Sequence, residues 1–146
     1  MAFVSVTRLR VRSLRFMPGF FLHAAGSTSQ IRRADGFIVG SLLRDRRLTF
    51  WTMTVWHGQA DMRRYITNGA HFKAMPKLMD WCDEASVVHW EQPEEALAGW
   101  EDADQRMRVG GSPVQGAPSQ RAPSGPDVPA AANQQGSADY ARDVKE

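Results

Sequence analysis

The chain has 146 residues, a formal net charge of +2 and a single cysteine, and this length limits it to one folded domain. The lone Cys82 excludes an internal disulfide framework and fits a reducing compartment. No apolar run approaches the roughly 20 residues that a bilayer-spanning helix needs. We therefore expect a cytoplasmic protein with no membrane partner.

Charge is unevenly distributed along the chain. Residues 1–47 carry nine Arg and two Asp, whereas residues 80–104 carry nine acidic residues and no Lys or Arg. A nucleic-acid binder typically collects basic residues without an acidic segment of equal size, so we expect no nucleic-acid partner. The two charged regions are instead predicted to lie near each other, within one chain or across a dimer.

The first predicted element is a strand over residues 3–12, where hydrophobic character alternates with period two. Neither face is cleanly polar: one carries Thr7 among hydrophobic residues, and the other carries Arg8 and Arg10 beside valines. Such a strand is expected to be covered on both faces. Two sheets packed face to face in a homodimer would cover the second face, and the acidic region would supply partners for the arginines.

The remaining elements follow from helical spacing, alternation and turn signals. Pro18 suits the first turn of a helix, Asp35-Gly36 is a turn signal, and Asp45 to Arg47 is predicted to form a hairpin turn. The predicted elements are a helix over 18–31, strands over 37–43 and 48–56, a helix over 59–67, a helical segment through Phe72 and Cys82, a strand over 85–91 and an acidic helix over 94–107. In the helical segment, Pro76 makes a kink or lies in the first turn. The acidic helix is expected to contact the body through Leu97 and Trp100. This order is that of a ferredoxin-like α+β fold with an antiparallel sheet.

A change in composition separates the folded part from a tail. Residues 110–146 hold five of the eight prolines and five of the twelve glycines, and their only aromatic residue is Tyr140. Such a segment buries too little apolar surface to offset the entropy lost on ordering. We therefore predict a folded domain over residues 1–109 and a disordered tail over 110–146.

One strand–helix unit that ends at His71 holds two tryptophans, a tyrosine and two histidines, which suit the wall of a pocket. Trp51 and Trp56 are predicted on opposite faces of the strand, so at least one of them belongs to the core or an interface. Tyr65 is expected to face inward, toward a pocket or toward a structural hydrogen-bond partner. His71 follows a helix break and is the predicted functional histidine. His89, on the last strand, is either structural or lines the cavity.

No metal or nucleotide site is indicated by the spacing of the candidate residues. No two histidines have the i, i+4 spacing of a helical metal site, no Cys/His cluster exists, and no Gly-rich loop follows a strand. Cys82 lies in an apolar helical pattern, which favours a core role over a nucleophilic one. We therefore expect no metal ligand and no dedicated cofactor.

Four short motifs carry a family resemblance. They are the strand that ends in Thr54-Val55-Trp56, the amphipathic helix Asp61-Met62-Arg63-Arg64-Tyr65, the Gly69-Ala70-His71 step and the Asp35-Gly36-Phe37 turn. With these motifs, the pattern over about residues 3–92 resembles the dimeric α+β-barrel superfamily. It is most similar to the antibiotic-biosynthesis-monooxygenase-like domains, a group with uncharacterised relatives and a likeness to spheroidene monooxygenase.

The resemblance implies several functions, because members of this superfamily differ. Some oxygenate polyketide quinols without metal or flavin, some degrade haem, and some only bind or isomerise small molecules. The haem-degrading branch has an Asn on the first strand, where this chain has Thr7, and a Trp on the second helix, where it has Tyr65. His71 comes earlier than that branch's haem ligand, and Met75 lies near the expected place. Haem degradation is therefore not expected, although haem binding through His71 or another histidine stays an alternative.

These observations lead to one main hypothesis and two alternatives. The main hypothesis is a homodimeric α+β-barrel protein with a small-molecule pocket between sheet and helices, acting as a cofactor-independent monooxygenase on an aromatic or polycyclic substrate. His71 is the candidate catalytic base, and the candidate ligand-binding residues are Thr7, Trp51, Trp56, Tyr65 and His89. The alternatives are a non-enzymatic module that binds an apolar ligand and a haem-binding protein.

Overall fold

The computed structural model describes residues 1–45, 48–114 and 137–142 of the chain. The helices are a short 3-10 turn, η1, over Leu14–Phe16, followed by α1 over Met17–Ile31, α2 over Gln59–Ile66, α3 over Gly69–Trp81 and α4 over Trp100–Gly110. The strands are β1 over Ala2–Val11, β2 over Phe37–Arg44, β3 over Thr49–Trp56, β4 over Cys82–Gln92, β5 over Ser112–Pro113 and β6 over Ser137–Ala141. Among the described helices, none is long and apolar enough to cross a bilayer.

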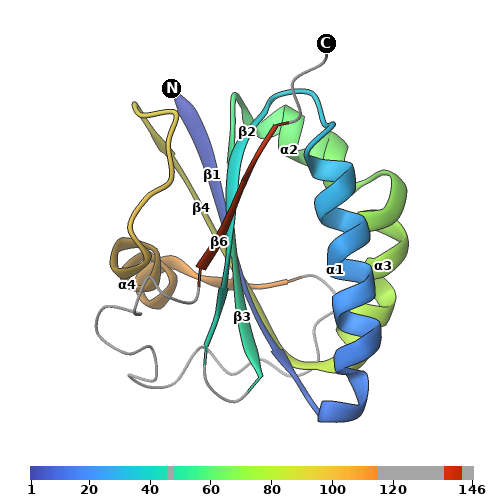
Figure 1. The fold of residues 1–146 in the computed structure, drawn as a ribbon. Coiled ribbons are helices and arrows are strands. Elements are labelled where there is room, and N and C mark those ends of the chain that lie inside the picture. Colours follow the sequence, from blue (N-terminus) through green and yellow to red (C-terminus); the bar gives the residue numbers. More distant parts are fainter. Residues whose placement is uncertain (46–47, 115–136, 143–146) are drawn as a thin grey trace.

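A single antiparallel sheet forms the middle layer of the domain, with strand order β5-β4-β1-β3-β2-β6. Figure 1 shows α1, α2 and α3 covering one side of this sheet and α4 lying on the other. We call these sides the helix face and the α4 face. The predicted α+β class with an antiparallel sheet is therefore confirmed.

The alternation of β1 distributes its residues between the two faces. Successive side chains of a strand point to opposite sides of a sheet. Phe3 accordingly belongs to the same buried cluster as Met62 of α2 on the helix face, whereas Val4 belongs to the same cluster as Met107 of α4 on the opposite face. Both faces of β1 are thus covered within one chain, which explains why neither face of this strand is cleanly polar.

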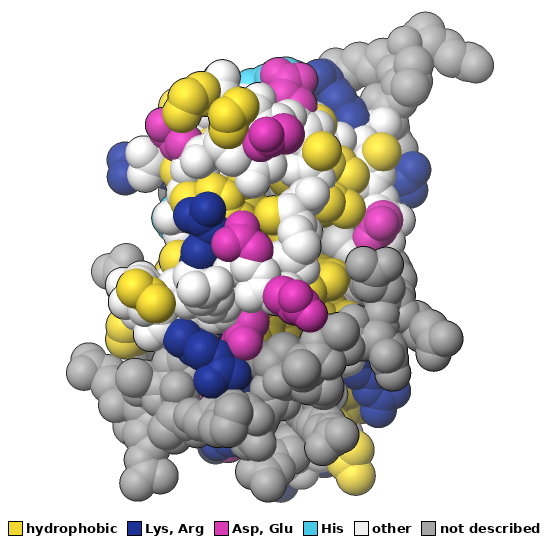
Figure 2. Space-filling model, turned by 90° about the vertical axis from the view of Figure 1, so that its left-hand side faces the viewer, with side chains coloured by type: hydrophobic (Ala, Val, Ile, Leu, Met, Phe, Trp, Pro, Cys, Tyr) yellow, Lys and Arg dark blue, Asp and Glu magenta, His cyan; other side chains and the backbone are white. Residues whose placement is uncertain are grey.

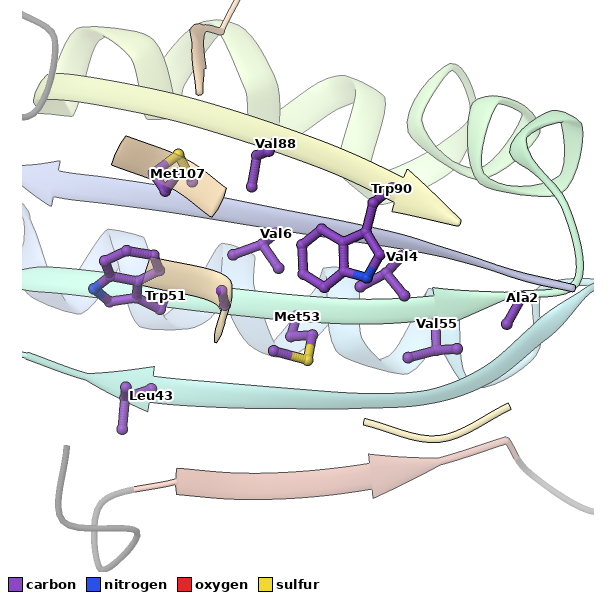
Figure 3. Packing of buried hydrophobic residues seen from close by; sticks show 11 residues of the cluster. Ala2, Val4, Val6, Leu43, Trp51, Met53, Val55, Val88, Trp90 and Met107 are labelled. Atoms are coloured by element: carbon purple, nitrogen blue, oxygen red, sulfur yellow. The ribbon is translucent and has the colours of Figure 1, made fainter. Parts of the chain in front are cut away.

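The α4 face holds a continuous apolar core, and Figure 3 shows its side chains projecting from the same side of the sheet. Ala103 and Met107 of α4 are buried in it, and the Trp51 and Trp100 rings lie 6.4 Å apart in an edge-on arrangement. Leu97 and Trp100 pack against this core, as the sequence predicts. Its buried members are Ala2, Val4, Val6, Leu43, Trp51, Met53, Val55, Val88, Trp90, Ala103 and Met107.

Charged side chains complete the α4 face. Figure 2 shows basic and acidic side chains next to one another over this side of the molecule. Arg106 and Asp102 of α4 lie 3.1 Å apart, and the Arg106 guanidinium lies 4.6 Å from the Trp90 ring centroid. At the end of β1, Arg8 pairs with Glu84 at 3.1 Å and Arg10 pairs with Asp83 at 2.7 Å.

The ion pairs at the end of β1 confirm that the basic and acidic regions meet, and they meet within one chain. Together with the cover that α4 provides, they account for the two observations from which a homodimer is predicted. Neither observation therefore requires a second copy of the chain, and the homodimer remains a prediction.

The helix face differs because its apolar residues form two separate clusters. One cluster lies beneath α2 and the end of α1, and the other lies beneath the start of α1 and the end of α3. The first contains Phe3, Ile31, Phe37, Trp56, Met62 and Tyr65; the second contains Val11, Met17, Phe20, Phe50, Ala74, Leu78, Met79, Cys82 and Ala85.

Two predicted boundaries differ from the structure. The acidic helix starts at Trp100 instead of residue 94, because Pro93 interrupts the chain after β4 and the Gln92 amide donates hydrogen bonds to the carbonyls of Glu94 and Ala96. Cys82 does not continue α3 but starts β4 with extended backbone angles. Pro76 lies inside α3 and not in its first turn.

Two short strands come from the region predicted to be a disordered tail. Most of that region, residues 115–136 and 143–146, lies outside the described residues, as do residues 46 and 47 of the predicted hairpin turn. Within the described part, β5 pairs with β4, and β6 pairs with β2 along its whole length. The composition hides β6 because Tyr140 is its only large side chain.

Candidate functional site

A chain of aromatic rings runs across the helix face. The ring centroids of His71 and Tyr65 lie 4.8 Å apart, those of Tyr65 and Trp56 lie 5.4 Å apart, and those of Trp56 and Phe37 also lie 5.4 Å apart. These side chains come from α3, α2, β3 and β2. The structure therefore brings together His71, Tyr65 and Trp56, as the sequence predicts, and adds Phe37. We call these four residues the aromatic cluster.

Tyr65 is central to the aromatic cluster. It follows Met62 by three residues on α2, so both side chains point from the same side of the helix into the domain. Its hydroxyl donates a hydrogen bond of 3.0 Å to the Ser27 carbonyl of α1. Burial is the main cause that raises the pKa of Tyr65 above its usual value, so the phenol stays protonated near neutral pH.

His71 lies in the first turn of α3, where a glutamine fixes its backbone. Gln30 of α1 accepts a hydrogen bond of 2.9 Å from the His71 amide and donates one of 2.7 Å to the Asn68 carbonyl. Gly69 makes this turn possible, because its φ of 64° is in the left-handed region and the Gln30 amide packs where a side chain would lie. The sequence gives no signal for Gln30, because its partners are 38 and 41 residues away.

Two nitrogen atoms of the aromatic cluster are buried without a hydrogen-bond partner. They are Nδ1 of His71 and Nε1 of Trp56, and both rings contact Tyr65. Burial is the main cause that lowers the pKa of His71, and the neighbouring Ile66 backbone opposes this effect. An unpaired buried polar atom costs roughly 1–3 kcal/mol, so two of them in one cluster indicate a place for a polar ligand atom.

A row of hydroxyl side chains separates the two apolar clusters of the helix face. Ser5 pairs with Thr54 across β1 and β3, and Thr7 pairs with Thr52. Within this row, the Thr54 hydroxyl makes only a long hydrogen bond of 3.4 Å to the Ser5 carbonyl. Of these residues the sequence singles out only Thr7. Alternation in both strands could have identified the others, once β1 and β3 were known to be neighbours.

A groove of about 580 Å³ opens on the surface between the end of α1 and α2. Its lining includes Arg33, Asp35, Asp61, Arg64 and Tyr65. Asp61 and Arg64 form an ion pair. Tyr65 belongs both to the groove and to the aromatic cluster, whereas His71 and Trp56 do not line the groove. Tyr65 is therefore the residue that the groove and the aromatic cluster share.

Two other predicted ligand-binding residues lie apart from the aromatic cluster. Trp51 is on the α4 face, where it is 2% exposed and its Nε1 donates to Asp45 at 3.3 Å. His89 is on the helix face and its ring centroid lies 5.3 Å from that of Phe3. Burial and then the nearby charge of Arg63 lower the pKa of His89. Trp51 is thus separated from the other candidates by the full thickness of the sheet.

The described part of the chain contains no cluster of three or more His, Cys, Asp or Glu residues with the geometry of a metal site. Cys82 is buried, and this burial is the main cause that raises its pKa to about 11. A thiol with such a pKa is a poor nucleophile at neutral pH. These findings agree with the core role predicted for Cys82.

Comparison with known proteins gives matches only at the level of structure. No protein-family model and no curated protein sequence matches the chain. SnoaB, a cofactor-independent oxygenase from Streptomyces nogalater, is 18% identical, with a TM-score of 0.54 over 64% of this chain and 94% of SnoaB. About a third of the present chain thus has no counterpart in SnoaB.

Two further solved structures have the same fold. A protein from Nitrosomonas europaea described as an antibiotic biosynthesis monooxygenase is 14% identical, with a TM-score of 0.57 over 63% of this chain and 99% of its own. Rv0793 from Mycobacterium tuberculosis is 12% identical, with a TM-score of 0.57 over 66% of this chain and 100% of its own. At these identities the likeness establishes the fold. The chain therefore has the ferredoxin-like α+β fold of the antibiotic biosynthesis monooxygenase-like proteins.

Proposed function

We propose that this protein binds a small aromatic or polycyclic molecule on the helix face and oxygenates it without a metal or an organic cofactor. The observation that carries the proposal is the pair of unpaired buried nitrogens, His71 Nδ1 and Trp56 Nε1, whose rings both contact Tyr65. The similarity in fold to SnoaB, a cofactor-independent oxygenase, supports the proposal.

The unpaired atoms suit the two polar tasks of such a reaction. With the imidazole proton on Nε2, Nδ1 of His71 is a free acceptor, and burial keeps the ring neutral. It can remove the acidic proton of an anthrone-type substrate as a general base. Nε1 of Trp56 is a donor without an acceptor, and it can donate to the oxygen on which the negative charge of the substrate anion gathers.

The reaction balances without any further reductant. After His71 removes a proton from the methylene carbon, the substrate anion reduces dioxygen itself. Conversion of the methylene group of an anthrone to a carbonyl releases four electrons, and one O₂ accepts them to give the new carbonyl oxygen and one water. The surrounding rings of Phe37 and Tyr65 would exclude bulk water from the anion.

The surface groove is the natural approach to the aromatic cluster. Tyr65 lines the groove and its ring contacts that of His71, and a hydrogen bond to Ser27 holds its hydroxyl in place. Release of this bond would let the ring turn and admit a planar ligand. Arg33 lines the groove as a cation that could attract an acidic substituent.

The test uses the full chain with anthrone as the probe. Binding is measured without oxygen by quenching of tryptophan fluorescence, and turnover is then followed with an oxygen electrode. We expect saturable quenching and oxygen consumption. His71→Gln should retain quenching and reduce the rate of oxygen consumption about 100-fold or more, the contribution of a positioned general base.

His57→Gln is the matched control, because His57 is an exposed histidine that pairs with Glu95 on the surface. This variant should consume oxygen like the unmodified protein. Quenching without oxygen consumption would contradict the proposed oxygenase activity and support a non-enzymatic binding module. After addition of haem, a Soret band that is shifted and sharpened relative to that of free haem would favour the haem-binding alternative. The absence of any quenching would overturn the proposal.

We also propose that the protein is a homodimer, in line with the expectation from sequence. A partner that used the sheet would have to bind beside α4, because α4 already packs on that face. Light scattering measures this directly: a mass near 16.3 kDa would exclude the dimer.

A further inference from the structure

We propose that the C-terminal strand β6 is part of the ligand site, with Tyr140 as a wall residue next to the aromatic cluster and Gly40 as the position that makes room for it. This inference rests on the proposed function and adds a specificity-determining residue to it. It assigns a role to the one aromatic residue in a segment whose composition predicts no structure.

Specific polar contacts hold β6 against the domain. Its backbone pairs with β2 from Val39 to Leu43. The Ser41 hydroxyl donates to the Asp139 carboxylate at 2.5 Å. Beyond the end of β6, Arg142 pairs with Asp35 at 3.5 Å. These contacts fix the register of β6, because a shift by one residue would turn Tyr140 to the other face of the sheet.

The Tyr140 side chain occupies the space that is left free because Gly40 has no side chain. They are direct partners in the pairing of β2 with β6. A Cβ atom on Gly40 would lie only 2.5–2.7 Å from atoms of the Tyr140 phenol, which is closer than Cβ atoms approach other atoms in proteins. The hydroxyl end of the Tyr140 ring therefore occupies the space that a side chain at position 40 would fill. Any other residue at position 40 would displace the ring.

This position places Tyr140 at the end of the aromatic cluster. Its ring stacks on Phe37 with centroids 5.8 Å apart and planes inclined by 21°. Tyr140 is also close enough to Tyr65 to contribute electrostatically to the raised pKa of that phenol. Gly40 also pairs with Thr54 of β3, so it lies at the end of the row of hydroxyl side chains across the sheet. Tyr140 thus borders both the aromatic rings and the hydroxyl row.

The Tyr140 side chain suits an aromatic ligand that carries an oxygen atom. Its ring offers a flat apolar surface, and its phenol can donate a hydrogen bond. Burial alone raises the pKa of Tyr140, so the phenol stays protonated and keeps its donor at neutral pH. The ligand class is therefore a planar aromatic ketone or phenolate whose oxygen points toward β2. The Tyr140 phenol would be a second hydrogen-bond donor to this ligand, in addition to Nε1 of Trp56.

The first experiment tests the fit between Gly40 and Tyr140 without any ligand. Hydrogen exchange of the β6 amides is measured for the full chain, for Gly40→Ala, for Tyr140→Ala and for the double variant. Gly40→Ala should expose the β6 amides to fast exchange in the presence of Tyr140. In the double variant the clash is gone, so adding Gly40→Ala to Tyr140→Ala should change exchange little. Equal effects of Gly40→Ala in both backgrounds would overturn the fit.

The second experiment tests the contact with ligand by anthrone quenching without oxygen. Tyr140→Phe keeps the ring and removes the donor, so it should weaken binding about 2- to 10-fold, the contribution of one hydrogen bond. Tyr140→Ala should weaken binding further. Phe72→Ala is the control, because Phe72 is an exposed aromatic residue on α3 outside the site; it should bind anthrone normally.

The two possible failures are distinguishable. If the unmodified protein binds anthrone and both Tyr140 variants bind it equally well, then this inference fails and the proposed function stands. If the unmodified protein shows no saturable quenching, then the proposed function fails, and the role of Tyr140 in ligand binding fails with it.

Discussion

The two faces of the sheet use the same strands for different purposes. On the α4 face, apolar side chains form one uninterrupted core, and Arg8 and Arg10 have carboxylate partners. On the helix face, two apolar clusters are divided by a hydroxyl row, and Trp56 and His71 each keep a buried nitrogen without a partner. The α4 face also leaves one buried nitrogen unpaired, Nε of Arg8, but this guanidinium is held in an ion pair with Glu84. The helix face leaves two nitrogens on neighbouring aromatic rings without a partner, at a cost in stability.

This difference locates function more sharply than aromatic content does. Both faces have a buried tryptophan on β3, Trp51 on one and Trp56 on the other. The Nε1 of Trp51 has Asp45 as its acceptor, but the Nε1 of Trp56 has none. Since buried donors are normally satisfied, the unsatisfied one indicates the side where a ligand is expected.

The largest effect is expected from Trp51→Ala on the α4 face. Trp51 is 2% exposed and contacts Trp100, so its truncation leaves a large cavity in the core. The free energy of unfolding, measured by urea denaturation, should fall by about 3–5 kcal/mol. Anthrone quenching of the folded fraction should remain. A stable variant that no longer binds anthrone would instead place the ligand on the α4 face and reverse the comparison.

The sequence predicted the ion pairs of the α4 face but not the helix that covers it. The meeting of Arg8 and Arg10 with the acidic region was predicted because oppositely charged segments of equal size attract. Cover by α4 was not predicted, because an acidic helix with only Leu97 and Trp100 as obvious contacts does not reveal which surface it packs on. The mixed polarity of β1 therefore suggested that a partner subunit covers its second face. In the structure, α4 of the same chain covers this face.

The helix face shows a different limit of sequence reasoning. His71, Tyr65 and Trp56 were predicted together because they lie on adjacent elements within 16 residues. Gln30, Phe37 and Tyr140 were not, because they reach the site through pairings that a local pattern does not show. The turn at Asp35-Gly36 was predicted from local chemistry, and Gly36 has the expected positive φ of 80°.

The second prediction concerns the ion pairs of the α4 face. The side chains of Arg8 and Glu84 are only 14% and 16% exposed. Glu84→Gln would leave a largely buried guanidinium without its charged partner, and we expect a loss of about 1–3 kcal/mol of unfolding free energy. The double variant Arg8→Met, Glu84→Gln should recover part of this loss. If the single variant is as stable as the unmodified protein, the α4 face does not depend on these pairs.

The third prediction compares the two tryptophans directly. Trp51→Phe removes a donor that has a partner, whereas Trp56→Phe removes a donor that has none. We expect Trp51→Phe to lower the unfolding free energy by about 1 kcal/mol more than Trp56→Phe does, since both changes remove a similar volume. Anthrone affinity should fall only for Trp56→Phe. Equal losses of stability would mean that the Trp56 nitrogen carries no cost.

The smallest expected effect is a dependence of stability on pH between about 5 and 7. Burial lowers the pKa of His71 in the folded state below its ordinary value of 6.5. The unfolded chain therefore takes up this proton first as the pH falls, so the unfolding free energy should be constant well above pH 6.5 and decrease as the pH falls through about 6.5. His89 has a lowered pKa for a similar reason, and it should contribute to the same slope.

Urea denaturation across this pH range separates the two histidines. His71→Gln should flatten part of the slope, and the double variant His71→Gln, His89→Gln should remove most of what remains, because carboxyl groups titrate mainly below pH 5. The slope thus measures whether the helix face holds a neutral buried imidazole. If His71→Gln leaves the slope unchanged, then the imidazole of His71 is hydrated like a surface group. A hydrated imidazole has water as the partner of Nδ1, so the unsatisfied nitrogen of His71 would no longer indicate a ligand on the helix face.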